Sequence, residues 1–169
     1  MKTLGAQLAQ YASYHRDRRN IATHFVGIPL IVLALASALS RPALPISIIA
    51  LTPALIGALA AAFYYLRLDL RLGAVMVGLE ALALLFGHWA AGLATADWGL
   101  LSGGLFVVGW LFQLVGHVWE GRKPAFVDDI VGLIIGPLFL AFEALAACGL
   151  FAALKQQVEA QAGRLRQRD

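Results

Sequence analysis

The sequence predicts an all-α membrane protein, a polytopic bundle of about five hydrophobic helices preceded by an amphipathic helix. Of the 169 residues, 60% are hydrophobic and only 14% are charged, whereas a soluble domain has about 25% charged residues. The charges are also missing from long stretches of the chain. This composition excludes a disordered chain and argues against an ordinary soluble domain.

Apolar windows along the chain predict the membrane-crossing helices. Some of these windows contain no Asp, Glu, Lys or Arg, and two contain a single glutamate, Glu80 or Glu143. About 20 apolar residues in a helix cross a hydrocarbon core of about 30 Å, so each window is long enough. Gly136-Pro137 offers a place for a break inside the last window. The windows are residues 20–40, 42–66, 72–96, 98–119 and 130–154.

A single integral membrane domain, residues 1–169, is therefore expected. Within its N-terminal part, Leu4, Leu8, Tyr11 and His15 recur at steps of three or four and share one helical face. The polar C-terminal tail has a helical composition and is expected in water or at the membrane interface. The expected parts are the amphipathic helix at 1–19, the transmembrane bundle at 20–154 and the tail at 155–169.

Positive charge marks the orientation of the chain. The net charge of +3 comes mostly from arginines beside apolar windows, so it indicates topology and contact with membrane lipids rather than a nucleic-acid partner. With the N-terminus inside, the loops follow the positive-inside rule, whereas the basic tail does not. Either the last window spans and the tail is outside, or the window doubles back, and we favour both termini inside with one irregular segment. The basic residues on the inner side are then Lys2, Arg16, Arg18, Arg19, Arg67, Arg71, Arg122 and Lys123. The sequence makes no prediction of oligomeric state.

All four histidines, His15, His24, His88 and His117, lie at or near the edge of an apolar window. In a simple up-and-down topology, His15, His24 and His117 fall on the same side of the membrane, whereas His88 counts nearer to the other side. Each alone is more often an interfacial residue with an apolar body and a polar tip. Imidazole is the commonest metal ligand, however, and polar residues kept at membrane depth are candidates for a functional role. The convergence therefore predicts a metal site near the cytoplasmic face.

Helical spacing supplies residues that could orient these ligands. Asn20 lies four residues before His24, and Gln113 and Glu120 share a helical face with His117. A ligating histidine usually gives its other ring N–H to a carboxylate or an amide, so Gln113 or Glu120 could accept it. The alternative for Glu120 is a solvated charge at a helix end, paired with a neighbouring basic residue.

Other catalytic signatures are missing from the sequence. It contains no Gly-rich phosphate loop ending in Lys-Ser/Thr, no GxSxG nucleophile elbow and no His-Glu-x-x-His. An iron or zinc site of scattered histidines with one or two carboxylates is the chemistry that this sequence can support. Tyr11 and Tyr14 could line such a site, with anchoring at the membrane interface as the alternative.

Two motif blocks resemble a known family. The first is Tyr14-His15, then Asn20 and His24 ahead of Gly27-Ile28-Pro29. The second is Gly109-Trp110-x-Phe112-Gln113-x-x-Gly116-His117-x-x-Glu120, followed by Arg122-Lys123-Pro124-Ala125 and Asp128. They are similar to the histidine segments of the 2-hydroxy fatty acid dioxygenase family of small polytopic membrane proteins, which includes a fungal enzyme of fatty-acid α-oxidation and bacterial relatives. The resemblance covers nearly the whole chain.

The resemblance implies an Fe²⁺-dependent dioxygenase that shortens a 2-hydroxy fatty acid by one carbon, with O₂ and without 2-oxoglutarate. Iron with open positions could hold such an acid through two of its oxygens, while the acyl chain lies between the helices. The metal ligands that the resemblance implies are His15, His24, His88 and His117. Around them we predict Asn20, Gln113, Glu120 and Tyr14 as catalytic residues, with Arg19 and Lys123 pairing with the substrate carboxylate.

Two other functions stay open at this point. Paired histidines on membrane helices could ligate haem axially in an electron-transfer protein. Alternatively, Glu80 and Glu143 could relay protons in a transporter, or the chain could be a scaffold without catalysis. Five helices without evident inverted repeats argue against a transporter. The expected location is the inner membrane if the chain is bacterial, and the endoplasmic reticulum if it is eukaryotic.

Overall fold

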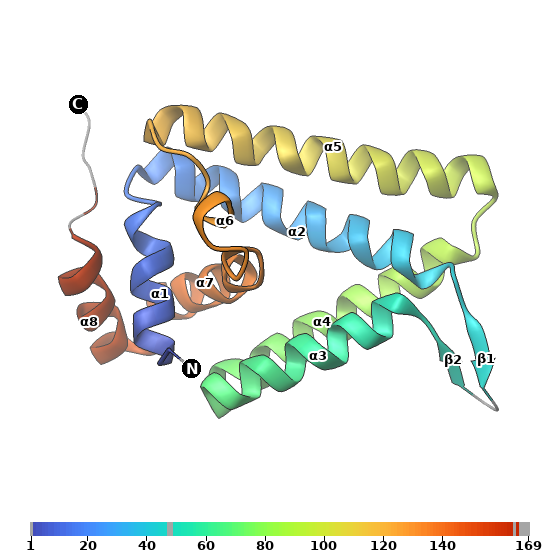
Figure 1. The fold of residues 1–169 in the computed structure, drawn as a ribbon, viewed down its shortest axis with the longest axis horizontal. Coiled ribbons are helices and arrows are strands. Elements are labelled where there is room, and N and C mark those ends of the chain that lie inside the picture. The colour runs from blue at the N-terminus through green and yellow to red at the C-terminus, as the bar shows by residue number, and fades with distance from the viewer. Residues whose placement is uncertain (1, 47–48, 164, 166–169) are drawn as a thin grey trace. The chain divides into compact units, whose positions relative to one another are not determined.

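The computed structural model describes residues 2–46, 49–163 and 165, and most of them are helical (Figure 1). The helical fold class predicted from the sequence is confirmed. The elements in chain order are α1 (Leu4–Ser13), α2 (Arg18–Ser40), β1 (Leu44–Ile46), β2 (Ile49–Leu51), α3 (Pro53–Leu68), α4 (Leu70–Ala91), α5 (Thr95–Glu120), α6 (Ala125–Asp128), α7 (Gly132–Ala147) and α8 (Ala152–Ala162).

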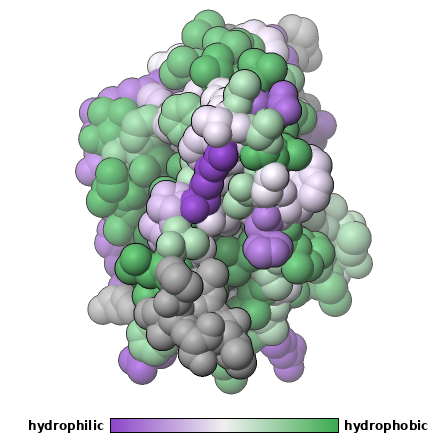
Figure 2. All heavy atoms as spheres, turned by 90° about the vertical axis from the view of Figure 1, so that its right-hand side faces the viewer, coloured by the Kyte–Doolittle hydropathy of each residue, from purple (hydrophilic) through white to green (hydrophobic). Residues whose placement is uncertain are grey.

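Three of the described helices are long and apolar enough to cross a membrane. They are α2, α4 and α5, with 23, 22 and 26 residues. Two more apolar helices, α3 and α7, have 16 residues each, which corresponds to about 24 Å against a hydrocarbon core of about 30 Å. Large apolar side chains such as Phe63, Leu82 and Leu100 are exposed, and Figure 2 shows hydrophobic residues over much of the face that it displays. These features are typical of an integral membrane protein.

The chain divides into two compact units. The first comprises residues 1–28 and 111–169, and the second comprises residues 29–110. In the second unit, α3 and α4 pack as a helical hairpin, and the carboxylate of Asp69 between them accepts the N–H of Leu72 at 2.8 Å. This bond caps the first turn of α4.

Small and hydroxylated side chains hold the helices of the second unit close together. Ser37 on α2 and Ser102 on α5 share a hydrogen bond of 2.6 Å between their hydroxyl oxygens. A Cβ atom on Gly87 of α4 would lie 2.5 Å from the main-chain oxygen of Ala36 on α2, so only glycine permits this approach. Both devices are typical of helix contacts in membranes.

The second apolar window, 42–66, differs from its prediction as one helix. Its first part forms a two-stranded antiparallel hairpin, in which Pro45 pairs with Ala50 and Ile46 with Ile49. Proline removes a helical N–H, and β-branched isoleucine favours a strand. The helix of this window begins only at Pro53, after Thr52 accepts the N–H of Leu55 in a side-chain cap.

The last apolar window also differs, because the predicted break at Gly136-Pro137 is wrong. Helix α7 continues through Pro137 and ends at Ala147. The chain then reverses through Gly149 and Phe151, which have φ angles of 86° and 56°. Glycine adopts this left-handed backbone without strain, so Gly149 suits the first position of this turn.

The first unit brings α1 against α7 and α8 (Figure 1). The C-terminal tail was expected in water or at the interface, but α8 packs on α1 and buries Val158 to 1% exposure. An ion pair of 2.5 Å joins Lys155 of α8 to Glu143 of α7. Glu143, which lies in the last apolar window, therefore has a basic partner that the window itself does not contain.

Candidate metal centre

Three buried histidines come together in the first unit: His15, His24 and His117. His15 lies in the turn between α1 and α2, His24 lies near the start of α2, and His117 lies in the last turn of α5. Their exposed fractions are 1%, 3% and 8%. Each offers a ring nitrogen, and these nitrogens all lie within 4.8 Å of one another. The convergence predicted from topology is present, and the group could hold a metal ion.

Main-chain carbonyls orient two of the rings. His15 donates its Nδ1–H to the carbonyl oxygen of Tyr11, and His24 donates its Nδ1–H to that of Asn20, both at 2.8 Å. A carbonyl only accepts, so the proton of each neutral ring lies on Nδ1 and the lone pair lies on Nε2. In both cases the acceptor is a main-chain carbonyl four residues earlier, and not the side chain of Gln113 or Glu120 that the sequence suggested.

The two lone pairs face each other. The Nε2 atoms of His15 and His24 are 3.1 Å apart, and two lone pairs repel at this distance unless a cation or a proton lies between them. Burial, helped by the neighbouring His24, holds the pKa of His15 well below its usual range, so its ring is neutral. Two nitrogens at right angles around a metal, with bonds of about 2.1 Å, lie about 3 Å apart. The donor set therefore fits a metal ion.

Aromatic side chains enclose His15 on the inner side of α1. The ring of Tyr11 stacks on the ring of His15 with a centroid distance of 4.2 Å. The ring centroid of Phe139 on α7 lies 5.1 Å from that of Tyr11. Helix α7 approaches this closely because Gly136 has no side chain, since a Cβ there would lie 3.0 Å from the Tyr11 hydroxyl. The sequence placed Tyr11 on the correct face of α1, but nothing distinguishes Phe139 from other apolar residues of its window.

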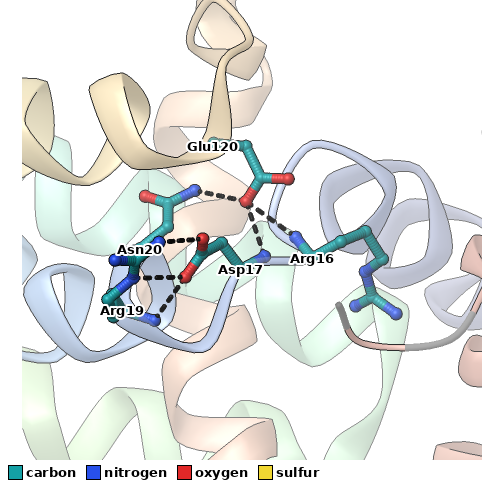
Figure 3. Close-up of polar contacts among 5 residues, drawn as sticks. All are labelled: Arg16, Asp17, Arg19, Asn20 and Glu120. Carbon is teal, nitrogen blue, oxygen red and sulfur yellow. Dashed lines mark hydrogen bonds and ion pairs between the residues drawn. The ribbon is translucent and has the colours of Figure 1, made fainter. Parts of the chain in front are cut away.

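Glu120 is buried, so its alternative as a solvated charge is wrong. Its exposed fraction is 1%, and its Oε2 atom accepts three N–H groups from the start of α2 and the preceding turn (Figure 3). The donors are the main-chain N–H of Arg16 at 2.9 Å, the main-chain N–H of Asp17 at 2.8 Å and Nδ2 of Asn20 at 3.0 Å.

Gln113 lies one helical turn before His117 on α5. Its side chain is 6% exposed, and its buried Nε2 atom has no hydrogen-bond partner among the described residues. A buried donor without a partner costs about 1–3 kcal/mol. Such a group on the histidine-bearing face is expected to meet its partner when a ligand is bound.

The other predicted site residues have partners within the fold. The Tyr14 hydroxyl donates to Asp128 Oδ2 at 2.8 Å, and Lys123 pairs with the same carboxylate at 2.5 Å. Both contacts lower the pKa of the Asp128 carboxyl group, and the contact with Lys123 has the larger effect. Arg19 binds both carboxylate oxygens of Asp17, at 3.2 and 3.0 Å. Tyr14, Lys123 and Arg19 thus stabilise the turns that flank the histidines.

A buried arginine, Arg16, lies next to the first histidine. Arg16 is 6% exposed, and it donates from Nε to the carbonyl oxygen of His15 and from Nη1 to that of Gly163, at 3.1 and 2.6 Å. Gly163 follows the last residue of α8. Arg16 therefore connects the histidine turn to the C-terminal helix, a contact that no local sequence pattern indicates.

His88 is not a member of this group. It lies in the last turn of α4, in the second unit. Its place among the metal ligands depends on the resemblance alone.

Comparison with known proteins agrees with the motifs. Residues 1–148 match the family model described as 2-hydroxy-palmitic acid dioxygenase Mpo1-like. The chain is 35% identical over 161 residues to the 2-hydroxy-palmitic acid dioxygenase MPO1 of Saccharomyces cerevisiae, which covers 92% of this chain and 87% of the yeast protein. No solved structure matches the chain significantly. Because the family match includes every histidine of the candidate metal centre, and the alignment to the yeast enzyme spans nearly the full length, the chain belongs to the Mpo1-like family.

Proposed function

We propose that this protein is an Fe²⁺-dependent dioxygenase that shortens 2-hydroxy fatty acids by one carbon at the three-histidine group. The observation that carries the proposal is the pair of Nε2 atoms of His15 and His24, which face each other at 3.1 Å inside the protein. His117 adds a third ring nitrogen. The substrate class comes from family membership, since the yeast relative is named for 2-hydroxy-palmitic acid.

Iron suits the proposed reaction better than zinc does. Neutral imidazoles bind both metals, but zinc has no redox chemistry, whereas the proposed reaction transfers electrons to O₂. Bound iron would supply redox chemistry with O₂ and polarise the substrate oxygens. One O₂ per acid balances the reaction: the C1–C2 bond breaks, C1 leaves as CO₂, C2 becomes the new carboxyl carbon, and water forms.

The chain's own residues supply orientation and a dry environment. The carbonyl groups of Tyr11 and Asn20 hold two imidazoles with their lone pairs inward, and the ring of Tyr11 covers His15. We propose His15, His24 and His117 as ligands, with His88 as a fourth candidate from the resemblance. The membrane setting gives the acyl chain an apolar path, in the inner membrane of a bacterium or the endoplasmic reticulum of a eukaryote.

Gln113 is proposed to donate a hydrogen bond to an oxygen of the bound acid. Replacing it by methionine, which has a similar shape but no donor, is expected to raise KM for the 2-hydroxy acid by about 10-fold, the loss of one hydrogen bond of about 1.4 kcal/mol. The iron content and the helical circular dichroism should not change. Steady-state kinetics with an unchanged KM and kcat would reduce Gln113 to a packing residue.

Metal replacement tests the proposed function. The purified protein is stripped with a chelator, reloaded anaerobically with Fe²⁺ or Zn²⁺, and incubated in air with 2-hydroxy-palmitic acid. Mass spectrometry should find the acid with one carbon fewer only in the iron-loaded sample. Equal product from the zinc-loaded protein, or none from the iron-loaded protein, would contradict the proposal.

A further inference from the structure

We propose that Glu120 is a positioning residue for the metal centre, and that its carboxylate sets the affinity of the three histidines for a metal ion. This inference rests on the proposed metal site and goes beyond it. Glu120 contacts the segments that carry His15 and His24, and it lies on the same helix as His117 (Figure 3).

The first contact fixes the turn that carries His15. This turn spans residues 14–17, between the end of α1 at Ser13 and the start of α2 at Arg18. Glu120 Oε2 accepts the main-chain N–H groups of Arg16 and Asp17 at 2.9 and 2.8 Å. Two bonds to consecutive peptide groups define where the turn lies relative to the end of α5, and so they define where His15 lies.

The second contact fixes the ring of His24. The same Oε2 atom accepts Nδ2 of Asn20 at 3.0 Å, while the carbonyl oxygen of Asn20 accepts the Nδ1–H of His24 at 2.8 Å. Asn20 is therefore held at its side chain by Glu120 and holds His24 with its main chain. Asn20 is therefore the single residue that connects Glu120 on α5 to the ring of His24.

The third link is covalent. Glu120 follows His117 by three residues in the last turn of α5, so both side chains lie on one face of that helix. A single carboxylate oxygen thus relates the positions of all three histidines, which come from three segments that are distant in sequence.

Local structure favours a carboxylate at this place. The two main-chain donors, Arg16 and Asp17, directly precede α2, whose N-terminal end carries partial positive charge, and a charged acceptor makes stronger hydrogen bonds than a neutral one. Gly116, one turn earlier on α5, lets α2 approach, because a Cβ there would overlap Asn20 and Thr23. The glycine brings Asn20 within reach of the carboxylate.

The test measures metal affinity in three variants that separate positioning from general stability. Glu120→Ala removes the acceptor, and Glu120→Gln keeps a neutral oxygen of the same reach. The control is Asp69→Ala, which removes a carboxylate that also accepts a main-chain N–H at 2.8 Å but lies in the second unit. The probe is Co²⁺, titrated into metal-free protein under argon and followed by its visible absorption. Circular dichroism monitors folding.

The wild type is expected to bind one Co²⁺ per chain. Glu120→Ala should weaken Co²⁺ binding by about 10- to 100-fold, which is typical when a residue that orients a metal ligand is removed. The Co²⁺ absorption bands should also change. The Co²⁺ affinity of Glu120→Gln should lie between those of the wild type and Glu120→Ala, because its amide oxygen still accepts hydrogen bonds but carries no charge. Asp69→Ala should bind Co²⁺ like the wild type even where its stability is lower.

Unchanged affinity and absorption in Glu120→Gln and Glu120→Ala would overturn the positioning role. If Glu120→Ala does not fold, Glu120→Gln decides the question by itself. A wild type that binds no Co²⁺ is a different result, because it removes the proposed metal site and this inference together. Tight binding by the wild type and equally tight binding by both variants would remove the inference alone.

Discussion

Replacing His24 or His117 by alanine is expected to abolish both metal binding and product formation. Each substitution removes one of three ring nitrogens that lie within 4.8 Å of one another. Removing a residue that hydrogen-bonds to a metal ligand typically lowers metal affinity by about 10- to 100-fold. Removing the ligand itself should lower it further. Elemental analysis after dialysis should find one metal ion per chain in the wild type and close to none in either variant.

Ser102→Ala provides the matched control. It changes a buried polar residue on the same helix as His117 and removes the 2.6 Å hydrogen bond to Ser37 in the second unit. Stability should fall by about 1 kcal/mol, while the metal content stays at one per chain. Stoichiometric metal in both histidine variants would refute the site. His88→Ala in the same series tests the fourth ligand, since it should lower the metal content only if His88 binds the ion.

Palmitic acid, which lacks the 2-hydroxyl group, is expected not to turn over. The hydroxyl oxygen is one of two substrate oxygens proposed to fix the C1–C2 bond at the site. Electron balance gives the same answer. Shortening a 2-hydroxy acid releases four electrons, which one O₂ accepts, whereas shortening a 2-deoxy acid releases six and would leave two without an acceptor. Parallel assays of the two acids at equal concentration should give product from the 2-hydroxy acid alone.

Equal rates on both acids would overturn the argument that the hydroxyl group positions the substrate. The iron-stripped protein serves as the blank for both substrates, so that oxidation of the acids by free iron or air is subtracted. A competition assay adds a second readout. Palmitic acid should inhibit turnover of the 2-hydroxy acid only weakly, because it offers the site a carboxylate without the neighbouring hydroxyl group.

The distance between His15 and His24 also separates the proposal from the haem alternative. Axial ligands on opposite sides of a haem iron lie about 4 Å apart at bonds of about 2 Å. The two Nε2 atoms are 3.1 Å apart, which is the spacing of neighbouring ligands instead. In the transporter alternative, Glu80 and Glu143 would relay protons, but Glu143 forms an ion pair with Lys155.

The placement of His24 and His117 on one side was predictable because it depends on the lengths of the apolar windows. His24 and His117 lie near the ends of long apolar windows, and window length fixes which end meets which side of a membrane. The acceptors for the ring N–H groups were not predictable in the same way. They are main-chain carbonyls of Tyr11 and Asn20, and every residue has a carbonyl, so no residue type signals this contact.

The role of Glu120 depends on a turn that the periodicity of the sequence does not show. The N-terminal helix was expected to run to residue 19, but α1 ends at Ser13 and α2 begins at Arg18. Only that break exposes the two N–H groups that the carboxylate accepts. The hairpin at Pro45 was missed because a short apolar run does not distinguish a strand from a helix. The docking of α8 on α1 was missed because it is a tertiary contact between segments that are distant in sequence.

Isotope labelling tests the central claim, that this protein uses O₂ to shorten 2-hydroxy fatty acids. Iron-loaded protein is incubated with 2-hydroxy-palmitic acid under ¹⁸O₂ in ordinary water, and the product is analysed by mass spectrometry. We predict the acid with one carbon fewer, carrying one ¹⁸O atom in its carboxyl group. A shortened acid without ¹⁸O, whose new oxygen then comes from water, or no shortened acid at all, would contradict the account.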